Sequence, residues 1–240
     1  MKLFKSCFYF IIISFFVSCS NNKVETGTLE NNDNIFQYGT MKKFLDSDYE
    51  GSLSIKELKR KGDFGLGTYN GVNGEMVVID GKVYRILPDG EVFEVPDHDL
   101  SPFTVVKFFE PDTSIKLDTN INFQELTKYL SELIADASKP IAIKISGEFE
   151  SVKTRTVKEQ KKPYPSLNDI VAEQIVFDFE NIRGSAVGFW FPPYFEPVNF
   201  PNYHFHFMKE GISGGGHLLN CRISSVTIEF DYPEELVIGL

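Results

Sequence analysis

The stretch Tyr203-His-Phe-His-Phe-Met-Lys-Glu-Gly-Ile-Ser-Gly-Gly-Gly-His217 holds three of the four histidines of the chain. His204 and His206 alternate with aromatic residues, a pattern that favours a β-strand because aromatic side chains fit the pleated surface. Successive side chains of a strand point to opposite faces. The two histidines are therefore expected on one face of a sheet, and the aromatic rings on the other.

The glycine run that follows is expected to bring a third histidine to the same place. Gly214, Gly215 and Gly216 tolerate positive φ and predict a tight reversal that delivers His217 to the face of the other two. Three neutral imidazoles at one point make a site for a divalent metal, usually zinc, with at least one coordination position open. The alternative is a group of unrelated histidines on a polar sheet face.

Residues 1–19 have the pattern of a bacterial lipoprotein signal and are set aside from the fold. Lys2 and Lys5 precede an apolar run over residues 8–17, which is too short to span a bilayer comfortably as a helix. Ser18-Cys19 closes the run, and the resemblance implies that Cys19 is lipidated, although Phe16 is bulkier than usual at its position. An ordinary cleaved secretory signal is the alternative.

Either signal predicts an exported protein, in the periplasm or at the cell surface, and a lipid anchor at Cys19 is the expected contact with the membrane. Residues 20–34 are polar and are expected to form a flexible tether.

Composition limits the kinds of fold and function that residues 20–240 can have. Removing 19 residues from 240 leaves 221, enough for one two-layer domain or two small ones. Cys221 is the only cysteine outside the signal, so no intrachain disulfide framework is expected. The net charge of −10 argues against nucleic-acid binding and means that a small anionic substrate would need a local cationic group. A homodimer is left open.

Short strands dominate the expected secondary structure, with a few short helices between them. Strands are expected at Ile35–Tyr38, Glu75–Asp80, Lys82–Leu87 and Phe103–Phe109, at Ile141–Val157 as one long strand or a bent pair, and in most of the chain from Ile175 onward. Helices are expected at Met41–Leu45, at Ser54 to Arg60, at Phe123 to about Ala137, and at Ser166 to about Gln174. Residues 62–71 read as a glycine-rich loop without a phosphate-binding fingerprint.

This order of elements predicts an α+β fold of the broad α/β class, with mixed or antiparallel sheets rather than a doubly wound parallel one. We expect an N-terminal β-rich domain with helices at residues 35–160 and a C-terminal β domain at 161–240 that carries the three histidines.

Three further residues are candidates for chemistry. Glu75 follows a glycine-rich turn at the start of a strand, Arg155 lies at the end of the long strand, and Thr68 could donate a hydroxyl group. Taken singly, each also fits a structural role: a solvated edge carboxylate, a surface cation and a residue that satisfies a turn.

Taken together, these segments resemble the α-acetolactate decarboxylase family. The resemblance rests on Gly62-Asp-Phe-Gly-Leu-Gly-Thr-Tyr69, Asn73-Gly-Glu-Met76, Thr154-Arg155, Tyr203-His-x-His206 and Gly215-Gly-His217, in this order, from about Ile35 to Leu240. It implies two β-rich domains with a zinc site between them, His204, His206 and His217 as zinc ligands, and Glu75 and Arg155 as active-site residues.

The implied reaction converts (S)-2-acetolactate to (R)-acetoin and carbon dioxide. Zinc would stabilise the enediolate that remains when carbon dioxide leaves, without an organic cofactor. Arg155 would hold the substrate carboxylate with two hydrogen bonds. The role of Glu75 stays open between contact with the metal and proton transfer.

The sequence departs from the family in one respect. The family usually carries a further active-site glutamate some tens of residues beyond the last ligand histidine. Here 23 residues follow His217, and Glu229, Glu234 and Glu235 do not occupy the matching motif.

Two other functions remain open at this stage. His204-x-His206-x-x-x-Glu210 matches the start of a cupin metal motif, which would imply an isomerase or an iron-dependent dioxygenase, although Val198 and His217 stand where that motif has glycines. Glu210 would be a ligand in a cupin, and we expect it to face solvent instead. The second alternative is a catalytically impaired lipoprotein that binds zinc.

Overall fold

The structure is a computed structural model that describes residues 33–134 and 136–240. The expected signal, residues 1–19, lies outside the described residues, as does the expected tether except for its last two residues. Asn34 does not belong to a tether, because it begins the first strand and pairs with Glu235. No helix among the described residues is long and apolar enough to cross a membrane.

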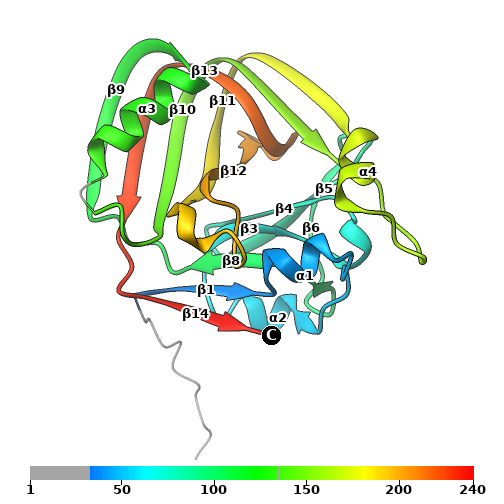
Figure 1. The fold of residues 1–240 in the computed structure, drawn as a ribbon. Helices are drawn as coiled ribbons and strands as arrows, with labels where there is room; N and C mark the ends of the chain where they lie inside the picture. Colours follow the sequence, from blue (N-terminus) through cyan, green and yellow to red (C-terminus); the bar gives the residue numbers. More distant parts are fainter. Residues whose placement is uncertain (1–32, 135) are drawn as a thin grey trace, which may run out of the picture.

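A mixed seven-stranded sheet forms the lower half of the molecule in Figure 1. Its strands lie in the order β14 (Glu235–Gly239), β1 (Asn34–Tyr38), β8 (Thr104–Lys107), β3 (Phe64–Thr68), β4 (Glu75–Ile79), β5 (Lys82–Ile86) and β6 (Val92–Glu94). The pair β1–β14 is parallel and the other neighbours are antiparallel. Two short strands, β2 (Leu53–Ser54) and β7 (Leu100–Ser101), form a separate pair.

An antiparallel five-stranded sheet with long, curved strands lies above it (Figure 1). Its order is β10 (Ile141–Thr156), β11 (Ile175–Phe191), β12 (Asn202–Lys209), β13 (Gly215–Asp231) and β9 (Thr113–Asn122). Strand β10 pairs with both β11 and β13, so four strands close on themselves. The expected α+β fold with mixed and antiparallel sheets is confirmed.

Short helices connect the strands, and their caps follow the sequence signals. The α-helices are α1 (Met41–Leu45), α2 (Ile55–Leu58), α3 (Phe123–Leu133) and α4 (Leu167–Ala172), and the 3₁₀ helices are η1 (Asn70–Val72) and η2 (Pro193–Phe195). Capping boxes at Ser54/Glu57 and Asn122/Glu125 start α2 and α3. Helix α3 ends earlier than expected, because Ile134 is extended and Asp136 accepts the Ser138 N–H in a turn.

The centre of the glycine-rich segment is a strand and not the loop that the sequence suggested, while Gly71 lies with positive φ in η1. Phe64–Thr68 forms β3, buried along its whole length between β4 and β8. A Cβ atom on Gly65 would lie 2.1 Å from the Val105 carbonyl oxygen. Gly65 and Gly67 therefore permit close contact within the sheet, rather than a turn.

The expected boundary between residues 160 and 161 does not follow the sheets. Strands β9 and β10 precede it but belong to the five-stranded sheet, and β14 follows it but belongs to the seven-stranded sheet. Long-range strand pairing, which carries no signal in the local sequence, sets the division into sheets.

The main hydrophobic core lies between the two sheets. It joins Val77 and Val105 of the seven-stranded sheet to Val187, Phe189 and Met208 of the five-stranded sheet. A second core lies between the five-stranded sheet and α3, and a third lies between the seven-stranded sheet and α2. The candidate site lies at the edge of the main core.

A buried lysine also links the sheets. Lys107, at the end of β8, is 1% exposed, and its ammonium nitrogen lies 3.1 Å from a carboxylate oxygen of Asp231, which ends β13 and is 1% exposed. The Asp33 carboxylate contacts the same nitrogen. The other Asp231 oxygen accepts the Glu110 N–H, so both partners of the buried pair are hydrogen-bonded.

We predict that Lys107→Met lowers the free energy of unfolding by about 3–5 kcal/mol, because it leaves the buried Asp231 carboxylate without a counter-charge. Adding Asp231→Asn should recover most of the loss. Urea unfolding followed by fluorescence of the single tryptophan, Trp190, measures both effects. A loss below roughly 1 kcal/mol in the single variant would contradict a linking role.

Candidate metal centre

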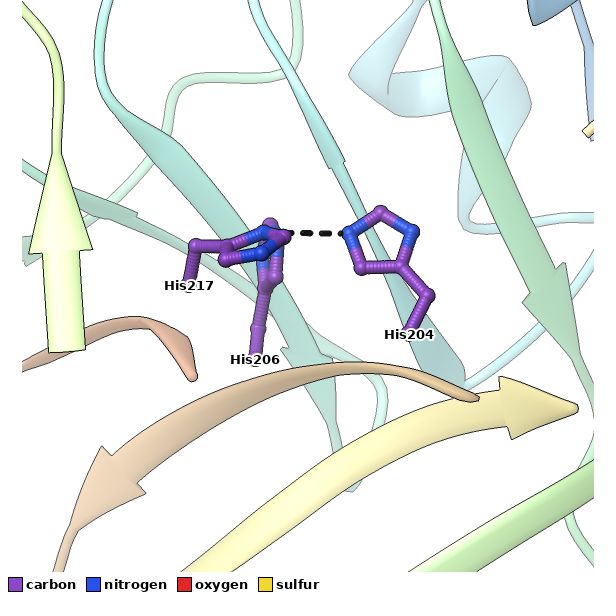
Figure 2. Close-up of side chains that lie close together, drawn as sticks. All are labelled: His204, His206 and His217. Atoms are coloured by element: carbon purple, nitrogen blue, oxygen red, sulfur yellow. Dashed lines mark hydrogen bonds between the residues drawn. The ribbon is translucent and has the colours of Figure 1, made fainter. Parts of the chain in front are cut away.

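Three histidines converge on one point because of strand alternation and strand register (Figure 2). His204 and His206 lie two residues apart on β12, so their side chains leave the same face of the sheet. His217, on β13, is paired directly with His206. The aromatic residues that alternate with His204 and His206 pack on the opposite face, as expected: Tyr203, Phe205 and Phe207.

The reversal that brings His217 back differs from the expected one. The turn lies at residues 210–213, where Gly211 and Ile212 have positive φ, and it is closed by the Lys209 N–H bond to the Gly214 carbonyl. Gly215 and Gly216 belong to β13 itself. A Cβ on Gly216 would lie 2.4 Å from the Arg155 carbonyl oxygen, so this glycine lets β10 and β13 approach beside the site.

The three imidazoles are close enough to share one ion. One ligand nitrogen from each ring lies within 4.8 Å of the others. His204 Nε2 and His217 Nδ1 are 3.2 Å apart, the contact drawn as a dashed line in Figure 2. Two nitrogens bound tetrahedrally at about 2.0–2.1 Å from zinc would lie roughly 3.3 Å apart. These two nitrogens therefore have the spacing of ligands of a single metal ion.

The backbone orients the third ring. His206 Nδ1 lies 2.7 Å from the Met76 carbonyl oxygen, which is only an acceptor, so this nitrogen carries the proton. The Nε2 atom is then free to bind a metal. A hydrogen bond of this kind commonly fixes the tautomer and orientation of a ligand histidine.

Burial keeps the rings neutral. Burial is the largest effect on each ring, and it lowers the pKa of His206 and lowers the pKa values of His204 and His217 well below the usual range for histidine. The Arg155 guanidinium lowers all three further, and the Glu75 carboxylate partly offsets the shift at His206. Metal ligation requires neutral imidazole, so the electrostatics favour metal binding.

Glu75, Arg155 and Thr68 lie at the same site. Arg155 is paired directly with His217 across β10 and β13, and Thr68 with Glu75 across β3 and β4. The Arg155 Nη1 donates a 2.8 Å hydrogen bond to the Glu75 Oε1, and the Glu75 Oε2 lies 3.4 Å from the His206 Nε2. Both charged side chains are largely buried, 7% exposed at Glu75 and 16% at Arg155.

Glu75 is therefore not a solvated edge carboxylate, and Arg155 is not a surface cation. The Thr68 hydroxyl donates to the Gly74 carbonyl at 2.7 Å, which stabilises the turn before Glu75, and Thr68 also faces the site. The structure brings together all six residues that the sequence singled out.

These residues line one cavity of about 50 Å³ together with a set of apolar side chains. The three imidazoles, Glu75, Arg155 and Thr68 form its polar lining. Sequence reasoning did not find the apolar lining, since ordinary core residues of distant elements form it and no local pattern marks them: Met41, Phe44, Val72, Phe103, Val157, Leu167, Ile170 and Phe200.

Glu210 does not belong to the site. Its side chain is 68% exposed and forms an ion pair with Arg183 at 3.3 Å. The expectation that Glu210 faces solvent is confirmed, and the fourth ligand of a cupin centre is absent from the described cavity.

Comparisons with known proteins agree on one family. The family model described as alpha-acetolactate decarboxylase matches residues 35–240. The alpha-acetolactate decarboxylase of Brevibacillus brevis is 36% identical over 206 residues, which cover 86% of this chain and 72% of that protein. The protein of the same name from Bacillus subtilis strain 168 is 37% identical over 194 residues, covering 81% and 76%.

Solved structures agree with the sequences. The crystal structure of alpha-acetolactate decarboxylase from Bacillus subtilis strain 168 superposes with a TM-score of 0.85 at 35% identity, covering 86% of this chain and 88% of that one. A Staphylococcus aureus protein of unknown function, described as similar to alpha-acetolactate decarboxylase, superposes with a TM-score of 0.83 at 26% identity.

We predict that the purified protein binds one divalent metal ion per chain and that His206→Ala loses most of it, because two imidazoles make a weaker site than three. Glu210→Ala is the matched control and should keep the metal content of the unchanged protein. Elemental analysis after dialysis measures both. Equal metal content in the protein and in its His206→Ala variant would contradict the site.

Proposed function

The chain belongs to the alpha-acetolactate decarboxylase family, and we propose that it converts 2-acetolactate to acetoin and carbon dioxide at the cavity between its two sheets. The observation that carries this assignment is the placement of Arg155 and Glu75 beside three neutral imidazoles in one cavity. A carboxy-lyase of this type needs a cation for the carboxylate of the substrate, an electrophile for the developing charge, and a route for a proton.

Zinc is the metal that we propose for the site. Three imidazole nitrogens leave a position open for an oxygen ligand, the arrangement typical of catalytic rather than structural zinc. When bound, zinc supplies Lewis-acid stabilisation of the negative charge that develops as carbon dioxide leaves. The ligands would be His204, His206 and His217.

Arg155 binds the carboxylate of the substrate in this proposal. Its guanidinium is largely buried and is the one cationic side chain among the described residues that line the cavity. A planar guanidinium donates two parallel hydrogen bonds to a carboxylate and is more weakly hydrated than an ammonium group. It also provides the local positive charge that a small anion needs in a chain with net charge −10.

Glu75 serves proton transfer or the positioning of water. Loss of carbon dioxide leaves an electron pair on carbon. This carbon must then accept a proton to give acetoin. Glu75 is the one carboxylate among the described lining residues, and its two oxygens face Arg155 and His206. Since Arg155 and Glu75 hydrogen-bond each other, a proton delivered through this pair would come from one direction and reach one face of the substrate, which would fix the chirality of the product.

The rival functions are not favoured. The cupin alternative requires Glu210 as a ligand, and its side chain is exposed and paired with Arg183. A zinc-binding protein without catalysis has no need of a buried arginine–glutamate pair beside the ligands. None of Glu229, Glu234 and Glu235 lines the cavity, so among the described residues the proton route rests on Glu75 and Arg155.

We also propose that the protein is exported and anchored by a lipid on Cys19. The support is the sequence pattern of residues 1–19, with its positive start, short apolar run and Ser18-Cys19. The enzyme would then meet acetolactate outside the cytoplasm.

We predict that Arg155→Lys reduces kcat/KM for 2-acetolactate by roughly 30- to 1000-fold, the effect of about 2–4 kcal/mol of lost transition-state stabilisation. A point-charge ammonium cannot reproduce the planar contact with two hydrogen bonds. Acetoin formation by the zinc-loaded protein is the measurement. Arg222→Lys, the same substitution at a 41% exposed position of β13, is the control and should leave the rate unchanged.

Two results would count against this account. Near-normal rates in Arg155→Lys would remove the carboxylate-binding role. Absence of acetoin with the unchanged, zinc-loaded protein would remove the enzymatic assignment.

We predict that Cys19→Ser releases the protein from the membrane fraction and abolishes incorporation of labelled fatty acid, because the thiol is the site of acylation. Cys7→Ser, at the other cysteine of the segment, is the matched control and should change neither. If the Cys19→Ser protein still carries label in the membrane fraction, the anchor is elsewhere or absent.

A further inference from the structure

Among the described residues that line the cavity, Phe200 is the one apolar residue whose ring contacts a candidate metal ligand in an aromatic pair. It lies between η2 and β12, and its ring meets the His204 imidazole edge-on, with centroids 5.3 Å apart and planes at 85°. Its side chain is only partly buried, whereas Phe44, Phe103 and Ile170, which also line the cavity, are 7%, 4% and 3% exposed and belong to the main core. Phe200 is thus a wall of the cavity that also borders solvent.

A buried pair of amides holds the backbone of Phe200 in place. The Phe200 N–H donates to the Asn199 Oδ1 at 2.7 Å, and the Asn199 Nδ2 donates to the Gln37 Oε1 at 2.9 Å. Asn199 is 1% exposed and Gln37 is fully buried. Such a network is costly to bury unless its members are hydrogen-bonded, and each amide here is.

The same network connects the loop before β12 to strand β1 and helix α1. The Gln37 Nε2 donates to the Val198 and Gly39 carbonyls at 2.7 and 2.9 Å, and the Met41 N–H donates to the Val198 carbonyl at 2.9 Å. Strand β1 and helix α1 therefore fix the loop before β12, and with it the position of the Phe200 ring. The chemistry assigned to the cavity has not used these residues.

The substrate has apolar parts that need a place of their own. In 2-acetolactate, carbon 2 carries a carboxylate, a hydroxyl, an acetyl group and a methyl group. In the proposed function the oxygens bind Arg155 and the metal held by the histidines, all of which belong to the polar lining. The alkyl group on carbon 2 is left to the apolar side chains, and close packing against them limits its size.

We propose that Phe200, positioned by the buried Gln37–Asn199 amide pair, sets the size of the alkyl group that the site accepts on carbon 2 of the substrate. Phe200 is a specificity-determining residue in this view, and Gln37 and Asn199 are positioning residues that act through it. The inference rests on the proposed function for the identity of the substrate.

The test compares 2-acetolactate with its homologue that carries ethyl in place of methyl on carbon 2. We expect Phe200→Leu to shift the ratio of kcat/KM values toward the ethyl substrate by about 10-fold or more. Discrimination of this size is typical for substrates that differ by one methylene group in a hydrophobic pocket. Asn199→Ala should shift the ratio in the same direction, because the ring loses its fixed position. Phe195→Leu is the matched control, the same change in the same segment but outside the cavity, and should leave the ratio unchanged.

Binding of unreactive acids separates this inference from the assigned reaction. Calorimetry on zinc-loaded protein compares 2-hydroxy-2-methylpropanoate with 2-hydroxy-2-methylbutanoate, which is longer by one methylene. If the unchanged protein forms no acetoin but Phe200→Leu gains affinity for the longer acid, the reaction is wrong and the role of Phe200 stands.

If acetoin forms and Phe200→Leu changes neither the rate ratio nor the affinity ratio by more than about twofold, the role of Phe200 is wrong and the reaction stands. Circular dichroism and zinc content establish that each variant is folded. Should Asn199→Ala fail to fold, Phe200→Leu alone decides the role of the ring.

Discussion

The pairing register of β10, β13 and β12 is the constraint on which the site depends. His217 lies directly opposite His206 on one side and Arg155 on the other, and paired residues project from the same face of a sheet. A slip of one residue would turn these side chains away from the cavity. It would also draw Phe205 and Phe207 out of the second core, so hydrophobic packing on one face of β12 fixes the chemistry on the other.

Charge balance is a second requirement, because the charged side chains of the site are largely buried. The Arg155 guanidinium and the Glu75 carboxylate hydrogen-bond each other, and the three imidazoles are kept neutral by burial. An unpaired charge in such a place would cost several kcal/mol. A divalent cation and a carboxylate-bearing substrate would enter a site whose own charges already cancel, and the substrate carboxylate would offset one of the two charges of the ion.

Local patterns predicted much of this structure. Helix caps at Ser54 and Asn122 and the alternation around His204 and His206 follow from interactions within a few residues. The sequence predicted a loop at the glycine-rich segment before Glu75, but its centre is a strand. Composition alone cannot distinguish a glycine that lets a neighbouring strand approach closely from a glycine that makes a turn. Strand β9 was not expected, and β14 was assigned to the wrong sheet, for a related reason, because both are defined by partners far away in the chain.

The sequence by itself determined which chemistry is available: three histidines within one strand and its return, a glutamate at a strand start and an arginine at a strand end. Only the tertiary structure decided that Glu75 and Arg155 form a buried pair facing those histidines, because the contact joins strands of two different sheets. It alone also decided the apolar wall and the amide pair that positions Phe200. These depend on how distant elements pack, and packing between sheets leaves no periodic trace in the chain that a local reading can detect.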